Sequence, residues 1–564
     1  MRNVKRHMRE NYYVVGEGIL TTGEDGGRTE RPTTLAELRK FRFSRLGPKG
    51  KPLDELLLAK VAKAMTVAPT EADPVQPVSA DPPVPAGFTY LGQFVDHDLT
   101  LDNTAAALGE QVTVAELLQG RSPALDLDSV YGRGPADADD DRFYAADKTH
   151  LKVGLTAALD GAGTNVNLNG YDLPRATQGS TKAERQRALI PDARNDENLV
   201  VAQTHLAFQR FHNRVVDHLA DHGVPGAMLF SRTRDLVVKH YQWMLRTDFL
   251  PRIVDASIVD DVFTNGRRFV EPAAGQDGPY PSLRFGDTPT MPIEFSVAAY
   301  RLGHSMVRAA YDWNRIFNQR RGTLRLLFIF SGTSGNFDPF NPNVNDQESG
   351  LFERLPTNWT VDWRRMYDFA GEAGRADLAG PDGFNLAQKI DTLLVDPLAQ
   401  LPFGAFGGSG IDPASPRLNL AFRNLVRANM VGLASGQQMA RFLGIGELKP
   451  DEILNGSGGA NLGSLTDTEK EQFTKRTPLW FYILREAELN GGRLTGVGGR
   501  IVAEVFHRAM EGSRVSIVRD PSWRPNLGPD PDTFRMVDLL LFAFEGRKDL
   551  LAPLGDEEPP APPA

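Results

Sequence analysis

The chain has 564 residues, of which 41% are hydrophobic and 24% are charged, a balance that is typical of folded globular proteins with a large core. Its formal net charge of −9 supplies no overall positive field for nucleic acid or for an anionic membrane surface. The lack of cysteine excludes disulfides, thiolate metal sites and cysteine nucleophiles. From length alone, about three or four domains are expected.

The N-terminal residues 1–9 are basic, but no apolar stretch of signal-peptide length follows them. No segment approaches the roughly 18 apolar residues that a membrane helix needs. We therefore expect a soluble protein without a membrane span or a nucleic-acid partner. It would be cytoplasmic or exported by a route without a cleaved N-terminal signal, and its oligomeric state is unknown.

In chain order, the pattern is mainly helical with long loops and little β structure. Residues 1–50 are polar and are expected to wrap a surface. Apolar residues at helical spacing predict helices over 53–65, 88–102, 112–118, 192–221, 231–245, 293–310, 363–369, 418–429, 437–443, 466–475, 479–488 and 499–510. Pro251 is expected to break or follow the helix over 231–245.

The remaining segments predict less regular structure. Residues 324–330 are expected to form a short strand or buried coil, 70–86, 266–292 and 336–345 loops, 144–190 irregular structure, and 553–564 a Pro-rich, acidic, disordered tail. The sequence has no internal repeat, βαβ alternation or Gly-rich phosphate loop. It therefore gives no support to nucleotide-dependent chemistry.

The stretch 92–98 places an amide, two carboxylates and an imidazole within six positions. On a helix, Gln93, Asp96 and His97 would share one face, and Asp98 would point about 100° away from His97. The stretch thus predicts a face that can exchange protons, with a second carboxylate behind it. The alternative interpretation is a solvated helix face with an ordinary histidine.

Oxygen-bearing groups follow one another along the segment 122–128. Ser122, the carbonyl of Ala124, Asp126 and Asp128 stand at two-residue spacing, and an extended or looped backbone would turn them to one side. Hard cations such as Ca²⁺ prefer about six to eight oxygen ligands, and Asp98 would add one from the helix. The alternative is a half-buried acidic strand edge.

Arg194 and Glu197 lie three residues apart just after Pro191. Either they form a surface ion pair of little energetic value, or Arg194 faces an anion that develops during a reaction. His205 and His212, seven residues apart on the same predicted helix, are interpreted as structural.

His304 lies among apolar residues on a predicted helix, which is usual for a satisfied core histidine. As a ligand to haem iron, it would need a hydrogen-bond partner on its other ring nitrogen. Asn419 and Asn424 are candidates, and their spacing on the later helix favours Asn424.

Together and in this order, these segments resemble the animal-type haem peroxidase superfamily, the group of myeloperoxidase and lactoperoxidase, in its bacterial branch. The resemblance rests on 92–98 as distal helix, 122–132 as calcium loop, 192–197 with His205 and 210–214 as catalytic-arginine helix, 300–304 as proximal helix and 423–433 as the segment with the proximal Asn. Residues 434–444, 478–488 and 498–504 are similar to the bacterial branch. The resemblance implies one large helical domain over residues 51–552, rather than three or four domains.

The resemblance also implies a role for each candidate residue. His304 would bind haem iron, and Asn424 would accept its ring N–H. His97 would move the proton of hydrogen peroxide, Arg194 would stabilise the charge that develops as the O–O bond breaks, and Gln93 would hold distal water or a halide. The further implied residues are Asp96 and Glu197 for ester bonds to haem b, Arg301 for cofactor binding, and Asp98, Ser122, Ala124, Asp126 and Asp128 for Ca²⁺.

The expected activity is that of a peroxidase that forms a ferryl haem and oxidises a halide, thiocyanate or phenolic donor, with a role in the response to oxidative stress. Two residues depart from the family pattern. Asn198 stands where myeloperoxidase has a Met that forms a third haem bond, so no sulfonium link is expected. Asp128 stands where Ser is common, which adds negative charge at the calcium site.

Three other functions remain open. A fatty-acid dioxygenase of the same superfamily would carry a radical-forming Tyr three residues before the proximal His. Here Arg301 holds that position, and Tyr300 would be turned away by about 100° on a helix. A haem- or calcium-binding adhesion or stress protein is less favoured. A hydrolytic metal site at 96–98 is least favoured, because adjacent helical residues diverge.

Overall fold

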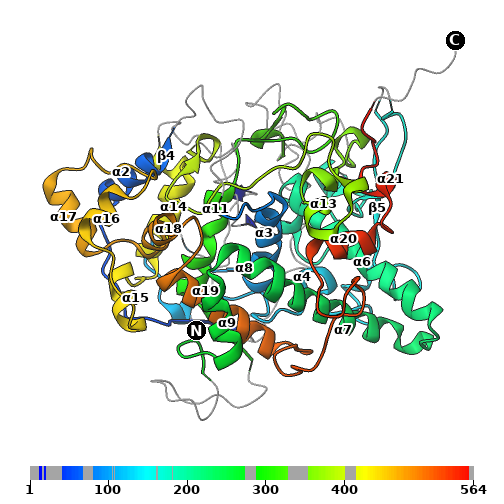
Figure 1. The fold of residues 1–564 in the computed structure, drawn as a ribbon, viewed down its shortest axis with the longest axis horizontal. Coiled ribbons are helices and arrows are strands. Elements are labelled where there is room, and N and C mark those ends of the chain that lie inside the picture. Colours follow the sequence, from blue (N-terminus) through cyan, green and yellow to red (C-terminus); the bar gives the residue numbers. More distant parts are fainter. Residues whose placement is uncertain are drawn as a thin grey trace.

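The structure is a computed structural model and describes residues 12–14, 18–20, 41–67, 80–104, 106, 108–159, 163–180, 182–272, 288–327, 353–399 and 415–557. Helices dominate these ranges, and the strands within them pair only two by two, so the prediction of a mainly α fold is confirmed. The helix α3 (Gly87–Leu99) lies near the middle of the molecule (Figure 1).

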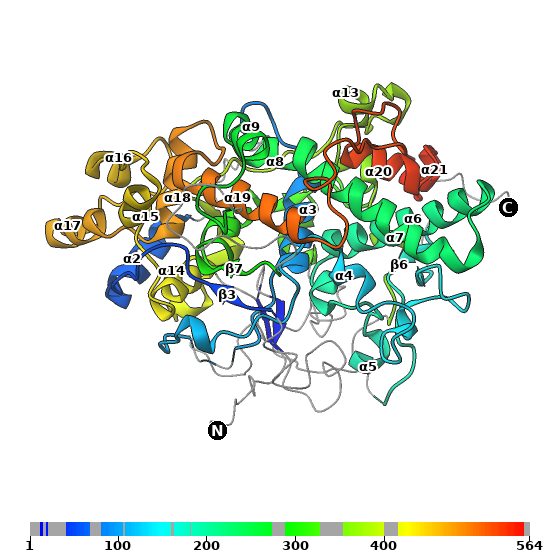
Figure 2. The same cartoon turned by 90° about the horizontal axis from the view of Figure 1, so that it is seen from below.

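Two groups of helices flank α3, as Figures 1 and 2 both show. The first contains α2 (Glu55–Met65), α14 (Leu420–Met430), α15 (Gly436–Leu443), α16 (Pro450–Asn455), α17 (Asp467–Lys475), α18 (Leu479–Leu489) and α19 (Gly496–Gly512). The second contains α6 (Leu199–Asp221), α7 (Gly226–Met244), α20 (Met536–Ala543) and α21 (Lys548–Leu551). α3 packs against α6, and α14 packs against α2.

The structure describes these further helices and helical turns. They are η1 (Val114–Glu116), α4 (Asp128–Tyr131), η2 (Asp141–Phe143), α5 (Lys182–Gln186), η3 (Ala193–Asp196), η4 (Leu245–Phe249), α8 (Leu250–Ile253), α9 (Ala256–Asn265), α10 (Ile293–Ser296), η5 (Ala299–Leu302), α11 (Gly303–Met306), α12 (Leu324–Leu327), η6 (Thr357–Trp359), η7 (Trp363–Arg365), α13 (Phe369–Ala373), η8 (Ala376–Leu378), η9 (Asp396–Ala399) and η10 (Pro416–Leu418).

Each strand is two to four residues long. Antiparallel pairs join β1 (Tyr12–Val14) to β2 (Gly18–Leu20), β5 (Gly154–Leu155) to β6 (Asn169–Asp172), and β8 (Ala310–Tyr311) to β9 (Gly322–Thr323). Parallel pairs join β3 (Phe43–Ser44) to β7 (Met291–Pro292) and β4 (Thr66–Val67) to β10 (Leu394–Val395). The parallel pairs tie segments that are far apart in sequence.

Side chains that cap backbone amides explain where the helices α2, α6 and α14 begin. Asp54 accepts hydrogen bonds from the second and third backbone amides of α2, and Asn419 does the same for α14. Asn198 caps α6 by accepting a hydrogen bond from Val201 N. Asp and Asn are favoured at this position because their side-chain oxygens satisfy backbone N–H groups that have no partner within the helix.

Several predicted elements differ from the structure. Residues 112–118 form only the short 3₁₀ turn η1, and 324–327 form the helix α12 instead of a strand or coil. Pro251 follows the end of α7 at Met244, which is one of the two predicted outcomes, and stands in the first turn of α8. The helix predicted over 192–221 begins with the separate 3₁₀ turn η3. The predictions for 336–345, for most of 1–40 and for 558–564 lie outside the described residues.

The segment 293–310 shows the largest difference. Three short turns replace the expected continuous helix, and its C-terminal end is extended and pairs as β8. The backbone leaves helical geometry at Ala298 (φ −131°, ψ −70°) and at Arg301 (φ −79°, ψ 15°). Apolar spacing alone could not show these breaks, because η5 is held by packing against α18 and α19.

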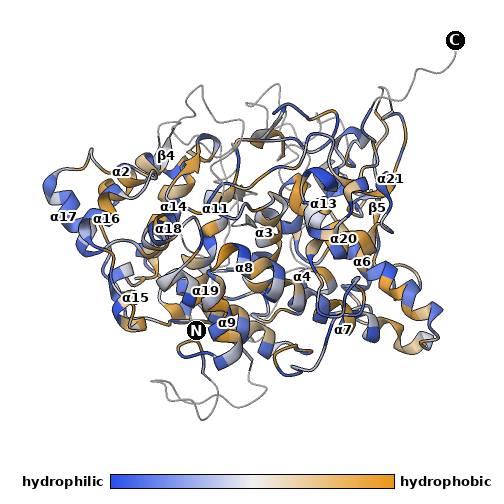
Figure 3. Ribbon diagram, viewed as in Figure 1, coloured by the Kyte–Doolittle hydropathy of each residue, from blue (hydrophilic) through white to orange (hydrophobic). Residues whose placement is uncertain are grey.

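One buried cluster of apolar side chains runs from Phe43 to Leu551. This continuity supports the single domain predicted over 51–552, which stays a prediction. Hydrophobic colour concentrates on inner elements such as α20, whereas α17 at the edge is largely hydrophilic (Figure 3). None of the helices in the described ranges combines the length and the apolar character that crossing a bilayer requires.

Candidate active site

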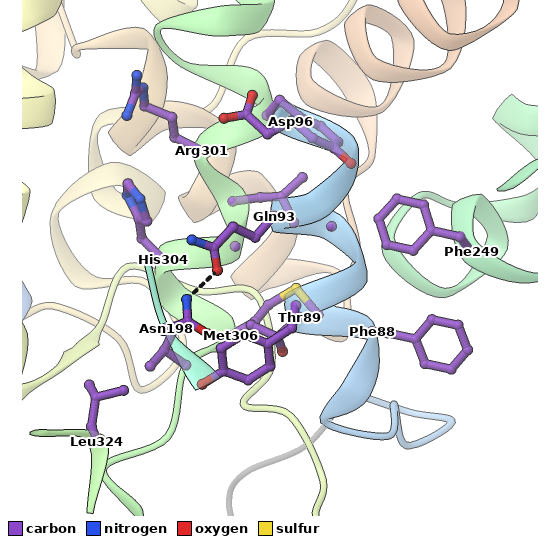
Figure 4. A pocket seen from close by; sticks show the side chains of 16 residues that line it. Phe88, Thr89, Gln93, Asp96, Asn198, Phe249, Arg301, His304, Met306 and Leu324 are labelled. Atoms are coloured by element: carbon purple, nitrogen blue, oxygen red, sulfur yellow. Dashed lines mark hydrogen bonds between the residues drawn. The ribbon is translucent and has the colours of Figure 1, made fainter. Parts of the chain in front are cut away.

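A pocket lies between α3 and the broken segment 298–307. It has an empty volume of about 710 Å³, which includes open solvent at its mouth. Its lining is mostly apolar, with Phe88, Thr89, Tyr90, Gly92, Gln93, Asp96, Asn198, Phe249, Tyr300, Arg301, Leu302, Gly303, His304, Met306, Val307 and Leu324. Figure 4 shows Gln93 and Asp96 projecting from α3 toward the segment that carries Arg301 and His304.

The helix α3 presents its polar residues in two directions, as the helical spacing predicts. Gln93 and Asp96 line the pocket, whereas Asp98 faces away from it toward the segment 127–129. His97 is fully buried and is not a pocket-lining residue. The solvated-face alternative is therefore wrong, because His97 and Asp98 are both 0% exposed.

Gln93 connects α3 to the start of α6. Its Nε2 donates a hydrogen bond to Glu197 Oε1, and its Oε1 accepts one from Asn198 Nδ2 over 2.9 Å (Figure 4). His97 Nε2 lies 3.7 Å from the same Glu197 oxygen. Gln93, His97 and Glu197 therefore lie together, and the Gln93 amide has protein partners on both ends.

Arg194 does not line the pocket. Its Nε and Nη2 donate to the two oxygens of Asp192 over 3.0 and 2.7 Å, and Nη2 also donates to the His97 carbonyl over 2.9 Å. A second guanidinium, from Arg121, lies 2.5 Å from Asp192. The surface-pair interpretation of Arg194 and Glu197 is wrong, because both are buried and Arg194 pairs with Asp192.

Burial and nearby positive charge keep His97 neutral. Burial lowers the pKa of His97 to about 3, and the charge of Arg194 is the next largest cause. Burial raises the pKa of Asp96, while the charges of Arg301 and Arg194 oppose the shift. Asp96 Oδ1 also accepts a hydrogen bond from Thr100 Oγ1 over 3.0 Å. A neutral imidazole and a buried carboxyl therefore stand side by side on α3.

His304 lines the opposite wall, and Asn424 of α14 contacts its other ring nitrogen. Asn424 Nδ2 lies 2.8 Å from His304 Nδ1, so the two side chains are in contact. The near atom is the amide nitrogen, however, rather than the expected oxygen. Asn419 instead caps α14 and donates to Thr66 Oγ1 over 2.7 Å.

Tyr300 is not turned away from the pocket, contrary to the expectation from helical geometry. It lines the cavity, and its ring stacks on Phe295 with a centroid separation of 4.7 Å and an interplanar angle of 11°. The cause is the non-helical backbone on either side of it, at Ala298 and Arg301. Arg301 also lines the pocket and donates from Nε to Ser296 O over 3.1 Å.

The calcium-loop prediction is supported only by charge. Burial, with the charge of Asp128 as the next largest cause, raises the pKa of Asp98 to about 8 and that of Asp126 to about 7. Hydrogen bonds to Asp98 come from Leu127 N and Ser129 N over 3.2 and 3.3 Å. The Ala124 carbonyl accepts from Asp126 N. Within the described part of the chain, no three His, Cys, Asp or Glu residues are grouped to hold a metal ion.

The buried polar atoms around the pocket suit a further group such as haem. Buried polar atoms without a hydrogen-bond partner in the described structure are found at Thr89 Oγ1, His97 Nε2, Ser296 Oγ, Tyr300 Oη and Asn424 Oδ1. Thr89 and Tyr300 line the pocket. His97 is next to the lining residue Asp96 in the sequence, and Ser296 and Asn424 contact the lining residues Arg301 and His304. Buried polar atoms normally have partners, so this cluster indicates a site for a further group.

Helical spacing did not identify Asn195 or Asp192 as residues of the site. Asn195 Oδ1 lies 2.9 Å from His97 Nδ1, and Asn195 Nδ2 lies 3.0 Å from His205 Nδ1. Asp192, which binds Arg194, was also given no role. In the sequence, only their position close to Arg194 pointed to them. A contact between residues that are 98 positions apart, such as His97 and Asn195, leaves no local pattern in the sequence.

Part of the chain matches a known protein family and a known protein. Residues 102–334 match the family model described as animal haem peroxidase, a range that includes Arg194 and His304 but neither His97 nor Asn424. A peroxidase-like protein of Margaritifera margaritifera is 30% identical over 129 residues, which are 22% of this chain. The matched part is only 14% of that protein's length.

A solved peroxidase structure shares the fold. Peroxidase A of Dictyostelium discoideum matches with a TM-score of 0.51 and 15% identity, covering 91% of this chain and 94% of that chain. Oryza sativa fatty acid alpha-dioxygenase matches with a TM-score of 0.47 and 12% identity, covering 91% of this chain and 80% of that chain.

Proposed function

We propose that this chain, whose residues 102–334 belong to the animal haem peroxidase family, reduces hydrogen peroxide and oxidises a small donor such as a halide, thiocyanate or a phenol. The observation that carries the proposal is the pair of facing walls. His304, in contact with Asn424, lines one wall, and Gln93, in front of His97 and Glu197, lines the other. The bound haem would supply an iron centre that accepts the oxidising equivalents of the peroxide.

His304 would hold the haem iron through Nε2. An Asn amide can turn over without moving its neighbours, because its two ends have nearly the same shape. A half-turn of Asn424 would bring its unpartnered Oδ1 to His304 Nδ1 as the acceptor of an N–H. This contact would leave the Nε2 lone pair of His304 for the metal and make the ring a stronger ligand.

His97 would act as the proton carrier on the opposite side. Its Nε2 would take a proton from hydrogen peroxide and return it to the oxygen that leaves as water. Arg194 supports this role by its charge and by its hydrogen bond to the His97 carbonyl, which fixes the end of α3. Gln93 would orient a water or halide, with its amide fixed by Glu197 and Asn198.

Asp96 and Glu197 would form ester bonds to haem methyl groups, and Arg301 would bind an acidic group of the cofactor. Asp96 and Arg301 both line the pocket, and Glu197 is buried beside Gln93. Asn198 has no sulfur and already caps α6 and binds Gln93, which supports the absence of a sulfonium link.

The choice between peroxidase and dioxygenase chemistry can be tested directly. The position of Tyr300 in the pocket favours keeping a fatty-acid dioxygenase as the second candidate function. We expect the haem-loaded chain to oxidise guaiacol, iodide, bromide or thiocyanate only when hydrogen peroxide is added. Oxygen uptake with linoleate in the absence of peroxide, without donor oxidation in its presence, would reverse the choice.

A calcium ion at Asp98, Ser122, Ala124, Asp126 and Asp128 would neutralise the carboxylates behind His97. We expect Asp126→Ala to lose about one bound calcium per chain and to shift the haem absorption bands, since Ca²⁺ binding needs several carboxylate oxygens. Metal analysis and absorption spectra of both proteins would measure this effect. Asp139→Ala, in an exposed acidic loop, is the matched control. Equal calcium content in all three proteins would contradict the calcium proposal.

A further inference from the structure

We propose that Asn195 and His205 are positioning residues that hold His97 in the form with a proton on Nδ1, so that the Nε2 lone pair faces the peroxide side. The inference rests on the proposed peroxidase function. It assigns roles to a carboxamide that had none and to a histidine that the sequence pattern presented as structural. The three side chains form one chain of hydrogen bonds from α3 through η3 to α6.

The first contact fixes the tautomer of His97. Asn195 Oδ1 lies 2.9 Å from His97 Nδ1, and a carboxamide oxygen can only accept a hydrogen bond. With the Asn195 amide in this orientation, His97 Nδ1 carries the proton, and in the neutral ring Nε2 is left with its lone pair. Nε2 is buried, and no described residue forms a hydrogen bond with it. This is the form of the ring that can take a proton.

The second contact holds the Asn195 amide in this orientation. Asn195 Nδ2 lies 3.0 Å from His205 Nδ1, and an amide nitrogen can only donate, so His205 Nδ1 must be the acceptor. If this acceptor were lost, the amide could turn over and present its N–H₂ group to His97, which would reverse the tautomer of His97. His205 thus acts on His97 through Asn195.

Packing holds both ends of this chain in place. Asn195 and His205 are each 0% exposed. The His205 ring meets Phe94 of α3 edge to face, with a centroid separation of 6.0 Å, and Phe94 stacks on Phe208 at 4.5 Å. The side-by-side contact of α3 and α6 therefore sets the distance that the amide spans (Figures 1 and 2).

The tautomer can be read without measuring activity. The full-length chain, labelled with ¹⁵N-histidine and loaded with haem in the diamagnetic ferrous carbon monoxide form, would be examined by ¹⁵N NMR. The His97 signals would be identified by their loss in His97→Gln. We expect a protonated Nδ1 and an unprotonated Nε2 for His97 in the wild type. A wild-type His97 with its proton on Nε2 would overturn the proposal.

Two matched pairs of variants separate positioning from packing. Asn195→Leu keeps the size but removes both hydrogen bonds, whereas Asn195→Asp keeps an acceptor for His97 Nδ1. His205→Phe keeps a ring but removes the acceptor, whereas His205→Gln offers an amide oxygen to Asn195. His212→Gln is the control on the same helix, because His212 contacts Tyr131 and the Thr149 carbonyl instead.

We expect Asn195→Leu and His205→Phe to give mixed tautomers of His97 and to slow the reaction with hydrogen peroxide by roughly 10- to 100-fold, a part of what proton transfer contributes. Asn195→Asp, His205→Gln and His212→Gln should keep the tautomer and stay within about threefold of the wild-type rate. The proposal would be overturned if Asn195→Leu and Asn195→Asp showed the same tautomer of His97 and the same rate of reaction with hydrogen peroxide. A wild type that ignores peroxide but shows this tautomer, lost only in Asn195→Leu and His205→Phe, would contradict the peroxidase function and support the positioning.

Discussion

Replacement of His97 by alanine is expected to slow the reaction of the haem-loaded chain with hydrogen peroxide by roughly 10²- to 10⁴-fold, the usual contribution of a positioned acid–base group. The reason is that no described residue forms a hydrogen bond with His97 Nε2, which lies 3.7 Å from Glu197 Oε1 beside Gln93. Stopped-flow absorption measurements of the first reaction with peroxide would give the rate constant, separately from the later oxidation of a donor.

The matched control is His212→Ala, which removes another buried histidine, one that contacts Tyr131 Oη and the Thr149 carbonyl instead of Asn195. It should bind haem and react with peroxide at nearly the wild-type rate. If His97→Ala instead reacts as fast as the wild type, His97 is not the proton carrier. A haem- or calcium-binding adhesion or stress protein, with incidental peroxide turnover, would then explain the chain better.

His304→Ala is expected to leave at most about a tenth of the wild-type haem after purification, because it removes the only protein ligand proposed for the iron. Haem content would be measured from the absorption spectrum and from iron analysis of protein at known concentration. Asn424→Ala should retain haem and shift its spectrum, since it changes only the partner of His304 Nδ1. Full haem content in His304→Ala would exclude His304 as the iron ligand.

Extraction with acid acetone gives the control for covalent attachment in the same preparations. We expect wild-type haem to resist extraction after turnover with peroxide, and haem in a combined Asp96→Asn, Glu197→Gln variant to be released. Complete release from the turned-over wild type would remove the proposed ester roles of Asp96 and Glu197, without affecting the role of His304.

The sequence by itself determined the features that depend on local geometry. Helical spacing predicted α3 and the opposite directions of Gln93 and Asp98, because side chains on a helix repeat every 3.6 residues. The same reasoning predicted most of the helices that flank α3. The choice of Asn424 over Asn419 was also confirmed, since Asn419 stands at the helix start, where its side chain caps the backbone.

Only the tertiary structure decided the contacts that join distant segments. Arg194 turns to Asp192 and to the His97 carbonyl, because two guanidinium groups share one buried carboxylate there. Tyr300 enters the pocket because the chain leaves helical geometry on either side of it while η5 packs against α18 and α19. Neither result follows from spacing, which assumes a regular helix.

The relation of His97 to Asn195 and His205 shows the same division. The sequence placed His97 on α3 and polar residues such as Asn195 next to Arg194. Histidine and asparagine are both common on protein surfaces as well as in functional sites. Their meaning came from two hydrogen bonds between helices, across 98 and 10 positions. Packing of α3 against α6 sets those distances, and periodicity along one chain segment carries no information about them.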